Sequence, residues 1–244
     1  MSKMLSLAAL AAIAIAQPSY AAPGLGEQVY GATVEKGVTE VETRYGRLTG
    51  GADAGEDKLV LEVAHGFTDH LYAAGLAEFE REPGGDRRLE ALGMETVVNV
   101  GRIPSLGLDV GLYGEYEAVR DGPDHVETKL LLQHKRGAFD GRLNLIAEKA
   151  LSGGNPVGFG YAASADWEVV DEVRVGAAAF GDFGPAKDFR LGGEHFAGPI
   201  VKAEVEDLGP GELEVETGYL FALGDARDDA KGQLRLLLEY EFRF

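Results

Sequence analysis

The last eleven residues, Leu234-Arg235-Leu236-Leu237-Leu238-Glu239-Tyr240-Glu241-Phe242-Arg243-Phe244, decide how the rest of the chain is interpreted. Every even-numbered position in this stretch holds Leu, Tyr or Phe, and the odd-numbered positions other than Leu237 hold Arg or Glu. Successive side chains of a strand point to opposite faces. The stretch therefore predicts a strand with one apolar face and one charged face, ending the chain on an aromatic residue.

This ending resembles the closing strand of Gram-negative outer-membrane β-barrel proteins, whose C-terminal aromatic residue is read by the barrel-assembly machinery. The resemblance covers the last strand and points to no individual member of the class. It implies an assembly signal at Tyr240, Phe242 and Phe244. It also implies that outer-membrane lipid, lipopolysaccharide and the assembly machinery are partners of the protein.

The first residues have the composition of an export signal. Lys3 precedes an apolar run from Met4 to Ala16, Pro18 breaks it, and Ser19-Tyr20-Ala21 supplies the small residues that signal peptidase prefers. The run is shorter than the roughly 20 apolar residues that span a membrane as a helix. We therefore expect residues 1–21 to be a signal peptide and the mature chain to begin at Ala22.

Charge and cysteine content exclude several classes of protein. The formal net charge is −18 and no basic cluster is present, so an anionic nucleic acid would be repelled. The chain has no cysteine, which excludes disulfides, thiolate metal sites and a lipidated N-terminal cysteine. An exported protein of this kind is periplasmic, secreted or located in the outer membrane.

After an irregular N-terminal lead at residues 22–37, apolar and polar residues alternate along almost the whole chain. Bacterial barrels have an even number of strands, with long loops outside and tight turns in the periplasm. The connections expected outside are 49–57, 82–88, 121–124, 152–156, 184–195 and 224–232, and those expected inside are 68–70, 102–105, 137–138, 171–172 and 207–211. The outer connection 121–124 is no longer than the inner connection 102–105. The pattern predicts an all-β fold for residues 38–244, a transmembrane antiparallel up-and-down β-barrel of about 12 strands, located in the outer membrane with both termini in the periplasm.

The strand faces opposite the apolar ones are rich in glutamate. The residues expected to line the lumen are Glu115, Glu117, Glu127, Arg142, Lys202, Glu204, Glu206, Glu212, Glu214, Glu216, Arg235 and Glu239. Eight-stranded barrels are filled by side chains and sixteen-stranded ones leave a wide channel. Twelve strands should leave either a narrow water-filled path or one plugged by salt bridges and the lead. Excess acid across a narrow lumen favours cations, so we expect a passive channel or transporter for small cationic or neutral solutes.

Two other functions remain open. An outer-membrane lipid hydrolase would need a serine beside a base. Ser105 is expected in a periplasmic turn, Ser152 in an outer loop across the membrane from His134, and Ser164 mid-strand on the polar face, and no family triad motif matches these residues. A non-conducting structural or adhesive barrel is the other. The acidic loop around 225–229 lacks calcium-loop spacing. We therefore assign no catalytic, cofactor-binding or metal-binding residue.

Overall fold

The structure, a computed structural model, describes residues 22–243. The expected signal peptide and Phe244 lie outside the described residues. The described chain contains no helix long and apolar enough to cross a membrane.

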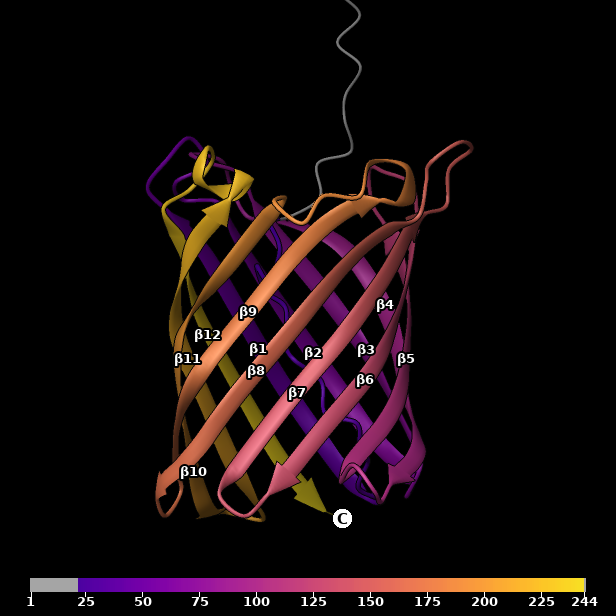
Figure 1. The fold of residues 1–244 in the computed structure, drawn as a ribbon, viewed down its shortest axis with the longest axis vertical. Coiled ribbons are helices and arrows are strands. Elements are labelled where there is room, and N and C mark those ends of the chain that lie inside the picture. The colour runs from indigo at the N-terminus through magenta and orange to yellow at the C-terminus, as the bar shows by residue number, and fades with distance from the viewer. Residues whose placement is uncertain (1–21, 244) are drawn as a thin grey trace, which may run out of the picture.

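Twelve antiparallel strands form one closed barrel, as the sequence predicted. Each strand pairs with its neighbours in sequence, and β12 pairs with β1 to close the ring (Figure 1). The strands are β1 (Val38–Thr49), β2 (Asp57–Thr68), β3 (Leu71–Arg81), β4 (Arg88–Ile103), β5 (Leu108–Val119), β6 (His125–Arg136), β7 (Phe139–Ala150), β8 (Gly158–Val170), β9 (Val173–Pro185), β10 (Glu194–Leu208), β11 (Gly211–Gly224) and β12 (Gly232–Arg243). Two short 3₁₀ helices, η1 (Ala186–Asp188) and η2 (Asp225–Arg227), lie in the connections before β10 and β12. Closure removes the unpaired strand edges that lipid does not tolerate.

The strand boundaries differ from the predicted ones where a turn interrupts the alternation. The apolar residue Leu106 was predicted to begin the fifth strand, but it lies in the turn before β5. Its backbone N–H bonds to the Ile103 carbonyl at 3.1 Å, and Gly107 follows with a φ of 61°. A left-handed residue at this point reverses the chain, so strand pairing resumes only at Leu108.

Side-chain exposure is the reverse of that in a soluble protein. Met94, Val63 and Leu234 on the outer face are 68%, 58% and 48% exposed, whereas Glu42 and Lys129 on the inner face are 3% and 2% exposed. Soluble proteins almost never bury such charges while exposing large apolar residues in a continuous band. An apolar exterior and a polar interior are the arrangement that a barrel adopts in lipid. The fold and its faces place the protein in the outer membrane.

The two ends of the barrel have different connections. One, here called the turn end, has the tight connections at residues 69–70, 104–107, 137–138, 171–172 and 209–210, and β12 ends there (Figure 1). The other, the loop end, has the connections at 50–56, 82–87, 120–124, 151–157, 186–193 and 225–231.

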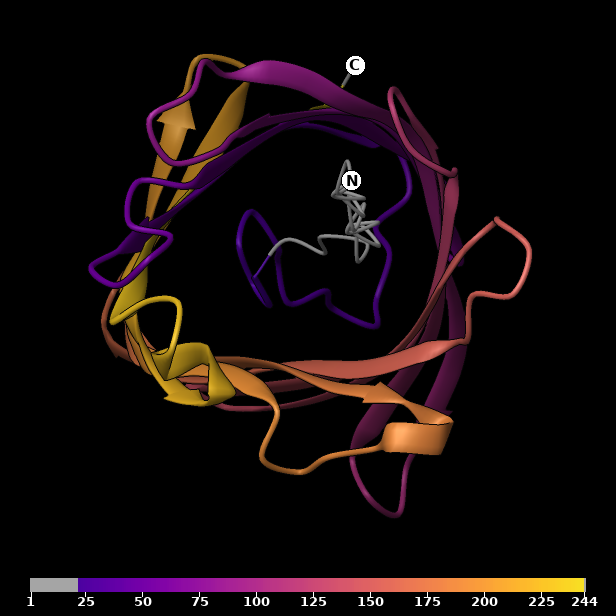
Figure 2. The ribbon, with the colours of Figure 1, turned by 90° about the horizontal axis from the view of Figure 1, so that it is seen from above.

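The lead, residues 22–37, lies inside the barrel (Figure 2). Starting from β1 at the turn end, it runs back through the interior and reaches the loop end at Ala22 (Figure 1). A lumen plugged by the lead was one of the two alternatives that the sequence left open. The path of the lead to the loop end was not predicted, because both chain ends were expected in the periplasm and the lead has no periodicity that would position it. The barrel thus encloses a segment of its own chain.

Candidate functional site: the barrel interior

Four side-chain amides on the barrel wall bind the backbone of the lead. Asn144 Nδ2 donates to the Tyr30 carbonyl at 3.0 Å, and the Tyr30 N–H donates to Asn144 Oδ1 at 2.8 Å. The Ala32 N–H donates to Gln133 Oε1 at 3.0 Å, and Asn99 Nδ2 donates to the Ala32 carbonyl at 2.6 Å. Gln233 Nε2 donates to the carbonyl of Pro23 at 2.9 Å. These bonds satisfy backbone groups that are removed from water and would otherwise be costly to bury.

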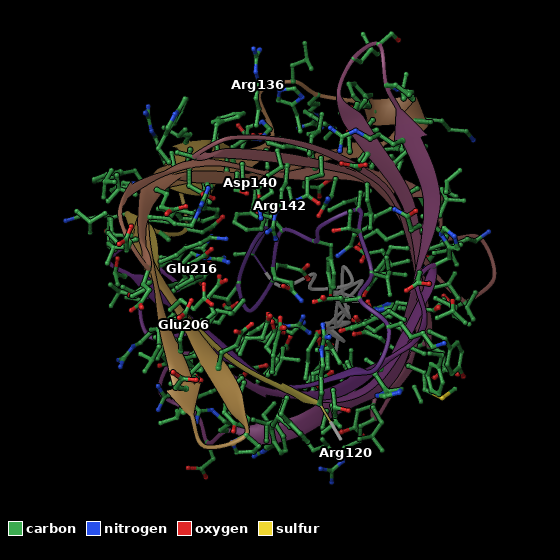
Figure 3. All side chains as sticks on the ribbon, turned by 90° about the horizontal axis from the view of Figure 1, so that it is seen from below. Arg120, Arg136, Asp140, Arg142, Glu206 and Glu216 are labelled. Atoms are coloured by element: carbon green, nitrogen blue, oxygen red, sulfur yellow. The ribbon has the colours of Figure 1, made fainter. Side chains whose placement is uncertain are left out.

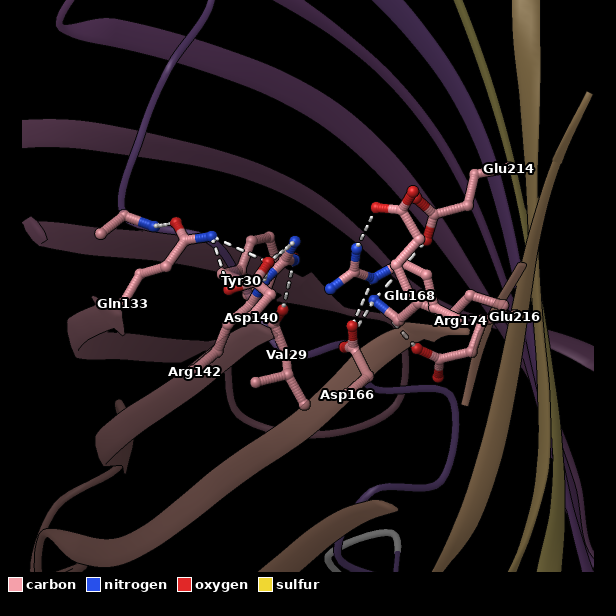
Figure 4. Close-up of polar contacts among 12 residues, drawn as sticks. Val29, Tyr30, Gln133, Asp140, Arg142, Asp166, Glu168, Arg174, Glu214 and Glu216 are labelled. Atoms are coloured by element: carbon pink, nitrogen blue, oxygen red, sulfur yellow. Dashed lines mark hydrogen bonds and ion pairs between the residues drawn. The ribbon is translucent and has the colours of Figure 1, made fainter. Parts of the chain in front are cut away.

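Arg142, which was expected in the lumen, joins the same region. Its Nη1 donates to the carbonyl of Val29 at 3.2 Å, and its Nη2 lies 3.0 Å from Asp140 Oδ2. Asp140 in turn accepts a hydrogen bond from the Gln133 amide at 3.0 Å. Figure 4 shows this group beside Tyr30 and Val29, and Figure 3 shows Asp140 and Arg142 inside the ring of strands. The middle of the lead is therefore held by a connected polar network.

Tyr30 connects the lead to buried charged side chains of the barrel wall. Its hydroxyl donates to Glu95 at 2.8 Å and accepts from Arg44 Nη1 at 2.9 Å. Arg44 also lies 3.0 Å from both Glu42 and Glu62. One buried arginine thus offsets part of the charge of several buried carboxylates, and its removal would leave them without that compensation.

The ammonium group of Lys129 occupies a cage formed by the lead and the wall. Its side chain is 1% exposed, and Nζ lies 2.9 Å from Glu127 and 3.3 Å from Glu27 of the lead. The rings of Tyr30 and Tyr113 lie on it, with centroids 4.8 and 4.5 Å from Nζ. Carboxylates and aromatic faces are the groups that recognise an ammonium ion. The expected lumen residue Glu127 is thus already engaged by a cation of the protein.

A second ionic cluster lies on β8 to β12. Glu216 Oε1 is 2.7 Å from Arg235 Nε, and Glu216 Oε2 is 3.5 Å from Lys202 Nζ. Lys202 is also 3.6 Å from Glu214 and 3.9 Å from Asp166, which forms an ion pair with Arg174 as well (Figure 4). Figure 3 shows Glu216 within the ring. Here two expected lumen residues, Lys202 and Arg235, both form ion pairs with a third, Glu216.

The remaining predicted lumen residues form fewer hydrogen bonds and ion pairs. Glu115 accepts a hydrogen bond from the Tyr113 hydroxyl at 2.6 Å, and Glu117 lies 3.9 Å from His125 Nδ1. Among the described residues, no Lys, Arg or His lies within ion-pair distance of Glu204, Glu206, Glu212 or Glu239. Of the predicted lumen residues, these four carboxylates on β10, β11 and β12 thus have no basic partner.

Strand register aligns these carboxylates in rows. Directly opposed residues on β10, β11, β12, β1 and β2 form the series Glu204, Glu214, Glu239, Glu42 and Glu62. A second series on β4 to β7 is Glu95, Glu115, Glu127 and Glu148. Like charges directly opposite each other on neighbouring strands repel.

The barrel has a cavity beside the start of the lead and another at the turn end, whose lining includes no residue of the lead. The loop-end cavity, about 190 Å³, is lined by the start of the lead and by acids that include Glu78, Glu117 and Glu148. The turn-end cavity, about 450 Å³, is lined by Glu168, Asp171, Glu172, Arg174, Lys202, Ala203, Glu204, Glu206 and Glu214. In both linings, Asp and Glu outnumber Lys, Arg and His.

An apolar cluster on the inner wall was not predicted from the sequence. Phe180, Phe196, Ile200 and Leu220 are 0–1% exposed and pack around Leu25 of the lead. The signal was present in the sequence, because Phe196 and Ile200 share the parity of the inward residue Lys202 on β10. Apolar residues on the inward parity indicate that something inside the barrel covers them.

Among the described residues, none of the three serines considered for a hydrolase forms a hydrogen bond with His134. Ser152 accepts a hydrogen bond from Asn155 at 2.8 Å, Ser164 is buried in β8, and His134 bonds the carbonyl of Gly107 at 3.0 Å. Ser105 lies in the turn before β5. Within residues 22–243, no group of three or more His, Asp or Glu side chains is arranged to hold a metal ion.

Comparisons with known proteins agree with this fold. No protein-family model matches the sequence, and no curated protein matches it significantly. An outer-membrane channel from Pseudomonas putida F1 has a similar structure, with a TM-score of 0.59 at 13% identity, covering 92% of this chain and 100% of that one. The NanC porin has a TM-score of 0.56 at 11% identity (84% and 100% covered), and the KdgM porin, solved in complex with disordered oligogalacturonate, has 0.55 at 12% (84% and 99%). At such identities the likeness concerns the fold, and the chain is a twelve-stranded outer-membrane β-barrel.

Proposed function

We propose that the protein is a narrow outer-membrane channel for small cations and small neutral solutes, with its lumen restricted by the lead. The observation that carries the proposal is the row of directly opposed carboxylates from Glu204 to Glu62, together with the absence of a basic partner for Glu204 and Glu239 among the described residues. Repulsion along such a row is relieved when mobile cations lie between the carboxylates. A water-filled passage of this kind concentrates cations and rejects anions.

The chemistry of the interior separates this protein from the KdgM porin. Oligogalacturonate, with which that porin was solved, is a chain of acidic sugars. A polyanion entering the present barrel would meet carboxylates in both cavities, and the nearby bases Lys58, Lys129 and Lys202 are already paired with acids. The shared fold supports conduction as the function, and the interior charge supports a different class of solute.

A non-conducting structural barrel is the second candidate, and the lead inside the lumen favours it. A lipid hydrolase is the third, and among the described residues no hydrogen bond between a serine and His134 supports it. Release of fatty acid from outer-membrane lipid by the purified protein would establish that third function.

Ion selectivity tests the proposal directly. The full-length protein is refolded, inserted into a planar bilayer, and the reversal potential is measured under a KCl gradient. We expect cation selectivity at low salt that fades near 1 M, since screening shortens from about 10 Å at 0.1 M to about 3 Å. An anion-selective pore would overturn the charge argument, and persistent silence in all conditions would favour the structural barrel.

A further inference from the structure

The lead is bound to the barrel wall as a ligand and is not part of the sheet. Its backbone between Val29 and Ala32 bonds to side chains of β4, β6 and β7, whereas regular ladder pairing begins only at Val38. The barrel is closed without it, because β1 pairs directly with β12. The segment therefore occupies a site that the closed barrel provides.

The amide side chains of the barrel wall form hydrogen bonds with this segment. The asparagine and glutamine residues in the strands are Asn99, Gln133, Asn144 and Gln233, and each of the four bonds a backbone atom of the lead. An amide offers a donor and an acceptor and so matches the two groups of an extended backbone. Such contacts recognise an extended peptide through its main chain.

Two side chains of the lead supply sequence specificity. Leu25 fills the apolar cluster around Phe180, and Tyr30 inserts between Glu95 and Arg44. Main-chain bonds combined with separate side-chain pockets are how strand-like peptides are recognised elsewhere. The interior thus has both parts of a peptide-binding site.

The residues that connect the lead to β1 are held in place by contacts with the barrel. The Gly37 N–H bonds to the Gly66 carbonyl at 2.7 Å, and Glu35 forms an ion pair with Arg243 at 2.5 Å. Gly37 has a φ of 81°, which suits a bend at the start of β1. Residues 22–34 precede these contacts in the chain.

We propose that the inner wall is a binding site for an extended peptide and that residues 22–34 are its resident, releasable ligand. The lead turns about residues 35–37 when it leaves the wall. Its release widens the passage beside the loop-end cavity, which the start of the lead lines, and its rebinding narrows the passage again. The effect on conduction rests on the proposed channel function, whereas the release itself does not.

A disulfide latch tests the release in the full-length protein. The chain has no cysteine, so an introduced pair is the only one present. A Cβ atom built at Gly111 lies 3.3 Å from the Cα of Ala32, which is within reach of a disulfide. In the variant Ala32→Cys/Gly111→Cys, we expect a low, steady bilayer current when oxidised and transitions to a larger current after reduction. The two single-cysteine variants should not respond to oxidant.

A second measurement follows release without conduction. In the single variant Ala32→Cys, a maleimide reagent labels the thiol only when the segment leaves the wall. Adding Asn99→Ala, Gln133→Ala and Asn144→Ala should speed labelling at least tenfold, since each lost hydrogen bond is worth roughly a factor of 2 to 10. Asn155→Ala, which changes a loop amide bonded to Ser152, is the matched control and should leave the rate unchanged. Heat-modifiable migration verifies that the barrel is intact.

The outcomes separate this inference from the channel proposal. Faster labelling in a protein that never conducts would support the peptide site and overturn the channel. Equal currents in the oxidised and reduced latch would leave the channel standing and overturn gating by the lead. A thiol at position 32 that is never labelled in either background, while a loop cysteine at position 155 is labelled promptly, would overturn release itself.

Discussion

Asn144 of β7 and Tyr30 of the lead are bonded in both directions, with the Tyr30 N–H donating at 2.8 Å and its carbonyl accepting at 3.0 Å. This exchange reproduces with a side chain the paired hydrogen bonds of an antiparallel ladder. Asn144 has no exposed surface, so water cannot replace either bond. One wall residue therefore controls two buried backbone groups in the middle of the lead.

Asn144→Ala should accordingly destabilise the protein by about 2–4 kcal/mol, because two buried groups lose their partners at once. Urea unfolding in lipid vesicles, followed by the fluorescence of the single tryptophan, Trp167, measures the free energy of unfolding. Asn155→Ala in the exposed loop should change it by less than about 0.5 kcal/mol. Equal effects of the two substitutions would show that the lead adds nothing to stability.

The outward register of β6 makes a second prediction. Leu130 is 36% exposed on the outer face, so Leu130→Arg should cost about 2–4 kcal/mol near mid-membrane. Glu214, beside the turn-end cavity, should tolerate Glu214→Arg at less than about 1 kcal/mol, because the side chain reaches water. Unfolding of both variants in vesicles compares them, and the reverse order of costs would mean a register shifted by one residue.

The last residue carries a prediction about assembly. Tyr240 and Phe242 stack with ring centroids 5.6 Å apart, and Phe244, outside the described residues, shares their parity. Phe244→Ser should leave export intact and reduce the amount of heat-modifiable barrel in the outer membrane several-fold. Leu106→Ser, in the turn before β5, serves as the control. An unchanged yield of folded Phe244→Ser would argue against recognition of the terminal aromatic.

The exterior of this protein was predictable because lipid requires apolar side chains at the outward positions of every strand. Alternation alone identified twelve strands, and the outward parity of Met94, Val63 and Leu234 agrees with their exposure. The requirement is strict because lipid offers a charged side chain no partner. Errors in the predicted strand boundaries occur at positions such as Leu106, where turn geometry determines where the strand begins.

The interior was less predictable because its partners come from distant parts of the sequence. Parity put Asn144 and Gln133 inside, but only the structure shows that both bind a segment more than 100 residues away. Plugging of the lumen by the lead was one of the alternatives, but residues 22–37 do not alternate, so their path and their contacts could not be predicted. Phe196 and Ile200 did carry a usable signal, since apolar residues at inward positions require a cover.

The turn-end cavity provides the final prediction, which concerns where selectivity resides. Glu172, Glu204 and Glu206 line this cavity, and within residues 22–243 none of them has a basic partner at ion-pair distance. Replacing all three by Gln should move the reversal potential under a KCl gradient towards zero, because the local cation concentration falls.

The matched control changes the same number of charges elsewhere. Replacing Asp225, Asp228 and Asp229 of the last outer connection by Asn also takes the formal net charge from −18 to −15, since three negative charges are removed in each variant. If selectivity comes from carboxylates at the narrow passage, the control should keep most of it at 0.1 M salt, where screening limits each charge to about 10 Å. Equal shifts in the two variants would instead assign selectivity to the overall charge of the protein, and the row from Glu204 to Glu62 would lose its role.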